Sequence, residues 1–494
     1  MNDMNKRTFL SLLLCVCSLS FLHAERVDMQ QAGADIQGRK LNTALINSTI
    51  DRLNANGGGT LFFPAGTYLT GSIHMKSNIT LELEAGATLK FSENFDDFLP
   101  YVEVRHEGIM MKSFQPLIYA VDAENITIKG EGTLDGQGKA WWTEFFRVLV
   151  DLRDNGKRNI NKYQPMFEKE NDLKALYAET NEDWHGTLDR RFFRPPFIHP
   201  IRCKNVRVEG VTIINSPFWT VNPEFCDNVT IKGITIHNVP SPNTDGINPE
   251  SCKNVHISDC HISVGDDCIT IKSGRDLQAR KLGVPCENIT ITNCTNAAEV
   301  VNSDSSSMGG VGGIAGQIYA PGSIAGCSNT GTVSKTVATT MRGFAGGIVG
   351  TCSGASISNC SNIGTVTSST YFAGGIIGRG ITSPAVKNCL NAGSVSAARA
   401  GAIASQGSFV LTNCFYDKEA SKPVTVAAYG KSDAYGVAQA VSTAALKTWG
   451  AAYQLNGGAA GGAGATGNIA DMSTWTFDAA NPGYPEIIAR DASG

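Results

Sequence analysis

The stretch that decides the fold runs from Asn228-Val229-Thr230-Ile231 through Asn254-Val255-His256-Ile257 to Asn288-Ile289-Thr290-Ile291. Each group begins with asparagine, which favours turns, and continues with the apolar and polar alternation of a half-buried strand. Similar groups begin at Asn125 and Asn205, and from Asn205 onward they recur at intervals of 23 to 34 residues. Short strands at this period predict an all-β solenoid, a right-handed parallel β-helix. Some of these asparagines form Asn-x-Thr glycosylation acceptors, but recurrence at strand starts favours the structural role.

The upstream segment predicts the beginning of the same coil. Its pattern indicates a short helix over Thr43–Leu53, followed by strands at Thr60–Phe63, Ile79–Leu83 and Thr88–Phe91. A helix lying over the first turn would cover strand edges that otherwise invite aggregation.

Three aspartates lie in two glycine-flanked clusters within the repeating stretch. Asp245 belongs to Asn243-Thr244-Asp245-Gly246, and Asp266 and Asp267 belong to Gly265-Asp266-Asp267-Cys268, 21 residues further on. On neighbouring turns of a coil, the two clusters would lie roughly 5 Å apart along its axis. Gathered carboxyls suit glycoside hydrolysis, in which one is protonated and another activates water. Either cluster alone is also an ordinary turn sequence, and the pair at this spacing favours the catalytic interpretation.

These motifs resemble the signature of glycoside hydrolase family 28, the polygalacturonases and related enzymes that cleave pectin. The resemblance extends back through Asn56–Thr60, Phe63–Tyr68 and Gly132–Gly136, and so covers about residues 25–295. The family pattern continues with Gly-His-Gly and then Arg-x-Lys after the double aspartate, and neither follows it in this chain.

The resemblance implies inverting hydrolysis of pectic galacturonan, with a pectic polysaccharide or oligogalacturonide as the partner and with no cofactor and no metal. Asp266 would be the general acid, and Asp245 with Asp267 would activate water across a gap of roughly 6.5 to 9.5 Å. Asn243 and Lys272 would bind substrate. The missing motifs imply impaired activity. They also support an alternative, a carbohydrate-binding or adhesin-like surface protein without turnover.

A second repeat begins after Thr295, where glycine, alanine and serine replace charged residues and no histidine occurs. Its unit of about 30 residues pairs a glycine-rich group with a cysteine-led group: 311–316, 345–350 and 373–378 alternate with 327–333, 360–366 and 389–395. This pattern resembles the GLUG repeats of bacterial surface and adhesin-like proteins. We therefore expect an incomplete hydrolase-like β-helix over 25–295, GLUG-like repeats over 296–415 and a C-terminal tail over 416–494. A recombined or misassembled gene and a natural fusion both account for the join.

The N-terminus and the charge balance bear on location and partners. Residues 1–24 carry Lys6 and Arg7 before a short apolar run, which predicts a cleaved export signal and a periplasmic, cell-surface or extracellular product. No later segment is apolar for long enough to span a membrane. A formal net charge of −4 and a pI near 6.1 argue against nucleic acid as a partner. We expect a monomer.

Two further features are a long insertion and a set of cysteines. Residues 139–193 are rich in charge and aromatic side chains and lack strand alternation, which indicates a large loop or a small helical excursion. Its aromatic residues would face substrate or pack against the coil. Twelve cysteines follow the signal, and most recur at turn or strand-end positions, which favours small buried side chains over disulfides or a zinc site.

Overall fold

The protein is described here by a computed structural model of the 494-residue chain. It describes residues 25–106, 108–155, 194–238, 241–274, 277–302, 310–336, 343–369, 371–428 and 438–447, and also Leu455, 475–476 and 484–487. The predicted signal segment and most of the predicted insertion lie outside these residues.

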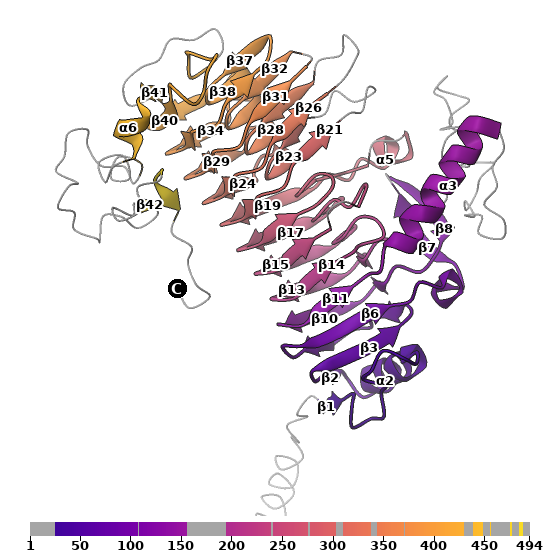
Figure 1. Ribbon diagram of the computed structural model, residues 1–494. Coiled ribbons are helices and arrows are strands. Elements are labelled where there is room, and N and C mark those ends of the chain that lie inside the picture. The colour runs from indigo at the N-terminus through magenta and orange to yellow at the C-terminus, as the bar shows by residue number, and fades with distance from the viewer. Residues whose placement is uncertain are drawn as a thin grey trace, which may run out of the picture.

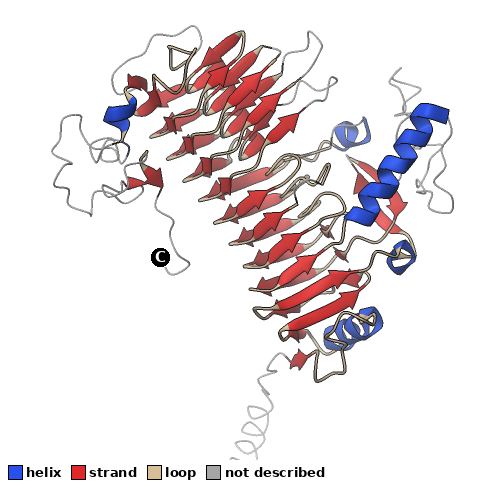
Figure 2. Cartoon of the chain, viewed as in Figure 1, coloured by secondary structure: helices blue, strands red, loops and turns tan. Residues whose placement is uncertain are grey.

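Stacked turns form one long parallel β-helix, as predicted (Figures 1 and 2). One of its two largest sheets has twelve strands, and each described neighbour pair within it is parallel. In sheet order they are β1 Glu25–Asp28, β2 Gly59–Phe63, β5 Ile79–Leu83, β10 Glu124–Gly130, β13 Lys204–Glu209, β15 Asp227–Lys232, β17 Lys253–Ser258, β19 Glu287–Thr292, β24 Ser323–Ala325, β29 Ser356–Ser358, β34 Ala385–Lys387 and β39 Val410–Thr412.

The second large sheet also has twelve strands and runs the length of the coil on another side of it. In sheet order they are β3 Gly66–Thr70, β6 Ala87–Phe91, β11 Thr133–Asp135, β14 Thr212–Ile214, β16 Thr235–His237, β18 His261–Ser263, β20 Thr295–Asn296, β25 Ser328–Asn329, β30 Ser361–Asn362, β35 Leu390–Asn391, β40 Cys414–Asp417 and β41 Ala438–Val441. The last of these strands lies in the segment predicted as a tail, so the coil extends past residue 415.

Smaller sheets close the remaining sides of the turns. Upstream these are β4 Ile73–His74, β9 Ile118–Val121 and β12 Ile198–Ile201. In the repeat region they are β21 Val300–Asn302, β26 Val333–Lys335, β31 Val366–Ser368 and β36 Val395–Ser396; β22 Gly310–Gly312, β27 Phe344–Gly346, β32 Phe372–Gly374 and β37 Arg399–Gly401; and β23 Ala315–Tyr319, β28 Val349–Ser353, β33 Ile377–Ile381 and β38 Ala404–Gly407. Two short antiparallel pairs belong to none of these parallel sheets: β7 Val102–His106 with β8 Ile109–Ser113, and β42 Trp475–Thr476 with β43 Glu486–Ile487.

Short helices lie outside the coil: α2 Thr43–Ala55, the 3₁₀ helix η1 Phe95–Phe98, α3 Lys139–Asn155, α5 Leu277–Leu282 and α6 Thr443–Leu446. The predicted helix α2 buries Ile46, Ile50 and Leu53 at the N-terminal end of the coil (Figure 1). Its apolar face therefore covers the first turns, as expected.

Five strands of the first large sheet, β10, β13, β15, β17 and β19, have asparagine as their second residue, because the chain turns there through a left-handed conformation. Asn125, Asn205, Asn228, Asn254 and Asn288 have φ between 53° and 60°. This region is costly for most residues, and asparagine tolerates it better than β-branched residues do. Their side chains also bond from turn to turn, with Asn228 Nδ2 donating to Asn205 Oδ1 at 2.7 Å. The structural role predicted for these asparagines is confirmed.

The core is a stack of aliphatic side chains that passes through the join without interruption. In the first large sheet, Ile257 is in register with Ile291, Ile291 with Ile324, and Ile324 with Ile357. All four are at most 1% exposed. Because the rows of the two sequence types coincide, the repeat turns bury the edge that the upstream turns would otherwise leave bare.

An asparagine ladder and a row of cysteines also cross the join. Asn296, Asn329, Asn362 and Asn391 are buried, and each successive side-chain amide donates to the next at 2.7 Å. Cysteines 260, 294, 327, 360, 389 and 414 are buried at matching positions of successive turns and are free thiols. The prediction that most cysteines are small buried side chains is therefore confirmed for these six.

The predicted insertion begins as helix α3, and its first aromatic residue, Trp141, belongs to the hydrophobic core. Trp141 is fully buried against Phe95, Phe98 and Phe114, with ring centroids 4.3 to 5.3 Å apart. For this part, packing is the role the structure assigns. The later aromatic residues, Tyr163, Phe167, Tyr177, Trp184, Phe192 and Phe193, lie outside the described residues.

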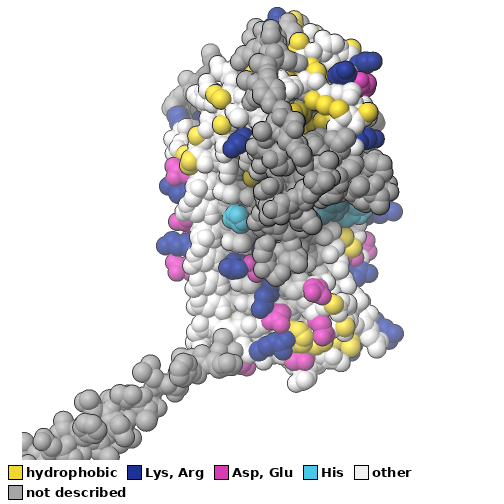
Figure 3. Space-filling model, turned by 90° about the vertical axis from the view of Figure 1, so that its left-hand side faces the viewer, with side chains coloured by type: hydrophobic (Ala, Val, Ile, Leu, Met, Phe, Trp, Pro, Cys, Tyr) yellow, Lys and Arg dark blue, Asp and Glu magenta, His cyan; other side chains and the backbone are white. Residues whose placement is uncertain are grey.

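The molecular surface carries mixed charge. On the face drawn in Figure 3, groups of Lys and Arg and groups of Asp and Glu are scattered among hydrophobic and other side chains, and neither sign of charge covers the face alone. Among the described residues, no helix is both long and apolar enough to cross a membrane.

Candidate active site

Two successive turns of the coil bring the predicted aspartates together. The Gly246 N–H donates to the Asp267 carbonyl, and the Ile247 N–H donates to the Cys268 carbonyl, both at 3.0 Å. The two clusters therefore lie on neighbouring turns, as their spacing predicted. Glycine is required at Gly246, because a Cβ there would lie 2.4 Å from the Cys268 carbonyl oxygen.

Asp245 is buried and forms an ion pair with the predicted substrate-binding residue Lys272. The Lys272 Nζ lies 2.8 Å from Asp245 Oδ2, and Asp245 is 4% exposed. The same ammonium lies 3.6 Å from the centre of the Trp219 ring, a cation–π geometry. Burial disfavours the charged ammonium, but the charge and hydrogen bond of Asp245 outweigh it, so the pKa of Lys272 is raised.

Hydrogen bonds of 2.9 to 3.2 Å hold the side chains of Asp266 and Asp267 in place. The Asp267 N–H donates to Asp266 Oδ1 at 2.9 Å, and Asn243 Nδ2 donates to Asp266 Oδ2 at 3.2 Å. Thr270 donates its hydroxyl to Asp267 Oδ2 at 3.2 Å. Asn243 is itself fixed by Arg194, whose Nη2 donates to Asn243 Oδ1 at 2.9 Å. Asn243 therefore orients Asp266, a role that the sequence prediction of substrate binding did not include.

The surroundings of these two carboxyls favour their protonated forms. Part of each side chain is accessible to solvent, but protein atoms are dense around both carboxyls. The resulting poor hydration is the largest cause of their raised pKa values. It raises the pKa of Asp266 well above its usual range, and the charges of Asp245 and Asp267 raise it further. Burial and then Asp245 raise the pKa of Asp267 to about 7, against the opposing effects of Lys272, Thr270 and Lys335. The site thus combines an ion-paired carboxylate with two carboxyls able to carry a proton.

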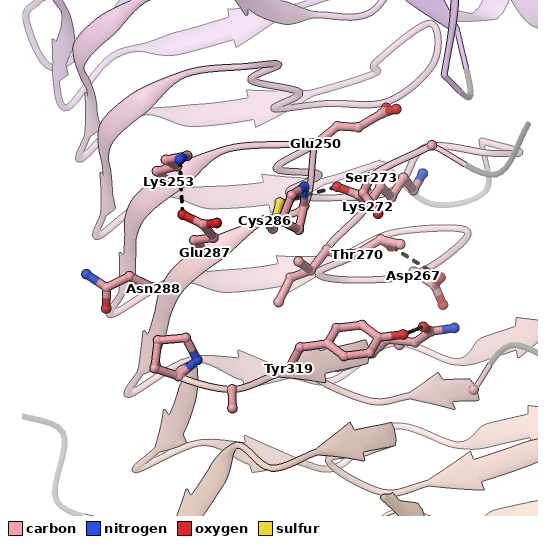
Figure 4. Close-up of a pocket in the computed structure, with 18 of the residues that line it drawn as sticks. Glu250, Lys253, Asp267, Thr270, Lys272, Ser273, Cys286, Glu287, Asn288 and Tyr319 are labelled. Carbon is pink, nitrogen blue, oxygen red and sulfur yellow. Dashed lines mark hydrogen bonds and ion pairs between the residues drawn. The ribbon is translucent and has the colours of Figure 1, made fainter. Parts of the chain in front are cut away.

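A pocket of about 980 Å³ opens at this site (Figure 4). Asp267, Thr270 and Lys272 line it, so one of the three aspartates faces the pocket and Lys272 links the pocket to Asp245. The pocket wall combines residues from 250–288 with residues from 302–321. The join between the two sequence types therefore passes through the pocket.

The repeat region contributes residues that sequence analysis did not assign to the site. Asn302, Gln317 and Tyr319 line the pocket. Lys335 is 1% exposed, donates a hydrogen bond to Asn302, and lies close enough for its charge to oppose the upward shift of Asp267. No motif marked these residues, because their position depends on how the first repeat turn stacks on the upstream coil.

A buried charge cluster lies beside the aspartates. Arg105, from hairpin β7–β8, forms an ion pair with Glu250 at 2.8 Å, and both side chains are at most 1% exposed. Glu250 is in register with Glu224 on one side and Lys272 on the other. Burial, and then the charge of Glu250, raises the pKa of Glu224 well above its usual range. Sequence analysis did not identify this cluster, because Arg105 is 145 positions from Glu250 in the chain.

Parts of the chain are similar in sequence to known polygalacturonases. Residues 184–309 match the family described as Glycosyl hydrolases family 28. A probable polygalacturonase of Vitis vinifera is 31% identical over 268 residues, which are 52% of this chain and 46% of that protein. An endo-polygalacturonase of Pectobacterium parmentieri is 28% identical over 244 residues, 47% and 53% of the two chains. The chain therefore spans about half the length of these curated relatives.

A solved structure extends the likeness beyond the matched segment. The crystal structure of a hyperthermoactive exopolygalacturonase from Thermotoga maritima superposes with a TM-score of 0.52 and 27% identity. The match covers 79% of this chain and 91% of that one, so the likeness in fold includes part of the repeat region.

Proposed function

We propose that this chain is a glycoside hydrolase that cleaves pectic galacturonan with inversion at the anomeric carbon. The observation that carries the proposal is the gathering of Asp245, Asp266 and Asp267 on two neighbouring turns, beside a pocket large enough for sugar rings. The similarity to polygalacturonases over residues 184–309 supports pectic galacturonan as the substrate class.

The environments of the carboxyls support separate roles. Asp266 has a raised pKa and holds the proton that a leaving glycosidic oxygen requires. Asp245, ion-paired with Lys272, and Asp267 together accept the proton of an attacking water. Charge develops on the sugar during cleavage, and the Asp245 carboxylate, held in advance by Lys272, stabilises it without reorganising. Asn243 keeps Asp266 oriented through its 3.2 Å hydrogen bond.

Lys272 has a further role in the proposal. It lines the pocket while bound to Asp245, so it holds Asp245 in place and offers its remaining N–H donors to a substrate carboxylate. The carboxylate of a bound uronide therefore lies beside the Lys272 ammonium, next to Asp245.

A second candidate function is carbohydrate binding at the cell surface without turnover. The continuous stacking of glycine-rich turns onto the coil favours it, because a long solenoid offers an extended binding surface. In this part of the proposal, residues 296–415 are GLUG-like repeats that lengthen the coil, and the chain is exported as a monomer.

Product stereochemistry tests the proposal and separates the two candidates. Full-length protein is incubated with polygalacturonate near pH 7, and proton NMR follows the first-formed reducing ends. Inverting hydrolysis of α-linked galacturonate gives β-anomers before mutarotation. Initial α-anomers would contradict the inverting mechanism, and binding without any new reducing ends would favour the non-catalytic candidate.

A further inference from the structure

The first turn of the repeat region forms one wall of the pocket, and strand β23 carries that wall. The strand starts beside the aspartates: the Gly316 N–H donates to the Ile269 carbonyl at 3.2 Å. A Cβ on Gly316 would lie 3.4 Å from Asp267 Oδ2. Tyr319 follows three residues later, roughly 10 Å along the strand. The strand therefore leads from the catalytic carboxyl to Tyr319.

Tyr319 presents an aromatic ring to the pocket. It is 49% exposed, and in Figure 4 its ring lies on the side of the pocket opposite Glu250. Ile318, the residue before it, is fully buried in the core, so alternation along the strand directs Gln317 and Tyr319 outward together. A half-exposed tyrosine on a rigid strand loses little entropy on binding and offers a flat apolar surface to a ligand.

Gln317 is oriented by this tyrosine. The Tyr319 hydroxyl donates to Gln317 Oε1 at 2.8 Å, which leaves the Nε2 amide group as the outward hydrogen-bond donor. The pair thus combines an apolar ring face with an adjacent amide donor. A sugar ring has complementary chemistry, because its C–H face is apolar and its edge carries oxygen acceptors.

We propose that Tyr319 and Gln317 form a sugar-binding subsite for a uronide ring of the substrate near the glycosidic bond that is cleaved. The inference rests on the proposed function, since the ligand is a unit of the same substrate. It assigns part of substrate recognition to the repeat region, so the two sequence types build one binding site.

Calorimetric titration with trigalacturonate tests the subsite. The full chain is used with Asp266→Asn as the parent, so that the ligand is not consumed. Tyr319→Ala in this parent should bind about tenfold more weakly, because the ring contact is lost. Tyr319→Phe should stay within about threefold of the parent, because it keeps the ring. Tyr371→Ala is the matched control, since Tyr371 is also exposed, at 39%, in the repeat region and does not line the pocket.

The outcomes separate the two proposals. Weaker binding by Tyr319→Ala alone supports the subsite. If the parent binds trigalacturonate and Tyr319→Ala binds equally well, the subsite is wrong and the proposed function stands. Equal weakening by Tyr371→Ala would also overturn the subsite, because the effect would then not be specific to the pocket. If the parent binds no trigalacturonate, both proposals fail together.

Discussion

At the scale of single residues, the three aspartates have similar sequence neighbours but different surroundings in the folded protein. Asp245 has a lysine partner at 2.8 Å, whereas Asp266 and Asp267 have neutral hydrogen-bond donors and each other. The arrangement maintains protonatable carboxyls near neutral pH, which acid–base catalysis requires. It also has a cost, because an ionised Asp267 is poorly solvated.

That cost predicts a pH-dependent gain from Asp267→Asn. The pKa of Asp267 in the folded protein is about 7, above its ordinary value of 3.8. Between these pH values the folded state holds a proton that the unfolded state has lost, so this group makes stability fall as pH rises from about 4 to about 7. Asparagine stays neutral in both states. Urea unfolding should therefore find the variant more stable than wild type at pH 8, with the difference shrinking towards pH 4.

Asp122→Asn serves as a control of opposite sign. The hydrogen bond from Arg202 lowers the pKa of Asp122, so this variant should lose a little stability at pH 8. A pH-independent effect of Asp267→Asn would contradict the assigned protonation of Asp267.

Some of the site could be predicted at this scale, and some could not. The asparagine and aspartate positions were visible because left-handed turns and glycine-flanked carboxylates leave fixed local patterns, as at Asn228 and Asp266. Arg105 and Tyr319 were not, because nothing in their neighbours in sequence records what the coil places against them. For Lys272, the family resemblance predicts substrate binding, but its ion pair with Asp245 could not be predicted because it depends on the stacking of two turns.

At the scale of elements, hairpin β7–β8 lies against the coil beside the aspartates. Arg105 inserts between Glu250 and the Phe225 ring, 4.4 Å from the ring centre, and His106 stacks on Trp219 with centroids 5.4 Å apart. Trp219 in turn contacts Lys272. The hairpin therefore supports the residues that position Asp245, although it is 132 or more positions away from it in the chain.

Arg105→Met should destabilise the protein by about 3–5 kcal/mol, because it leaves Glu250 buried beside Glu224 without its cation. Chemical unfolding of the full chain measures the loss. Arg52→Met is the matched control: its ion pair with Glu25 is nearly half exposed on both sides, so solvent screens it and the loss should be far smaller than for Arg105→Met. Similar losses in the two variants would mean that the hairpin is not held by the buried pair.

At the scale of the whole molecule, two repeat types make one coil. The strand order of both large sheets passes from β19 and β20 into β24 and β25 without a gap. Sequence analysis predicted a parallel β-helix, then a second β-rich repeat region, with a join near residue 295 because the composition changes there. The shared core and the shared pocket could not be predicted, since they depend on matching register between turns of different length.

The buried asparagine ladder should be a main support of this continuity. Asn329→Ala removes the acceptor for Asn296 and the donor to Asn362, both at 2.7 Å, and leaves polar groups unpaired in the interior. We expect a loss of about 1–3 kcal/mol in unfolding free energy. The neighbouring Ser328→Ala, at a half-buried position, should change stability by about 0.5 kcal/mol or less. A ladder variant as stable as wild type would show that the ladder does not support the join.

The most direct test of the central claim is reducing-end release from polygalacturonate by the purified full-length chain and by Asp266→Asn, both near pH 7. The acid must donate its proton in the transition state, while substrate binding depends on other contacts. We therefore predict release by the wild type, loss of that release in Asp266→Asn, and nearly unchanged binding of oligogalacturonide by the variant. Equal release by the two proteins, or no release by the wild type, would contradict the assignment of this aspartate cluster as a catalytic site.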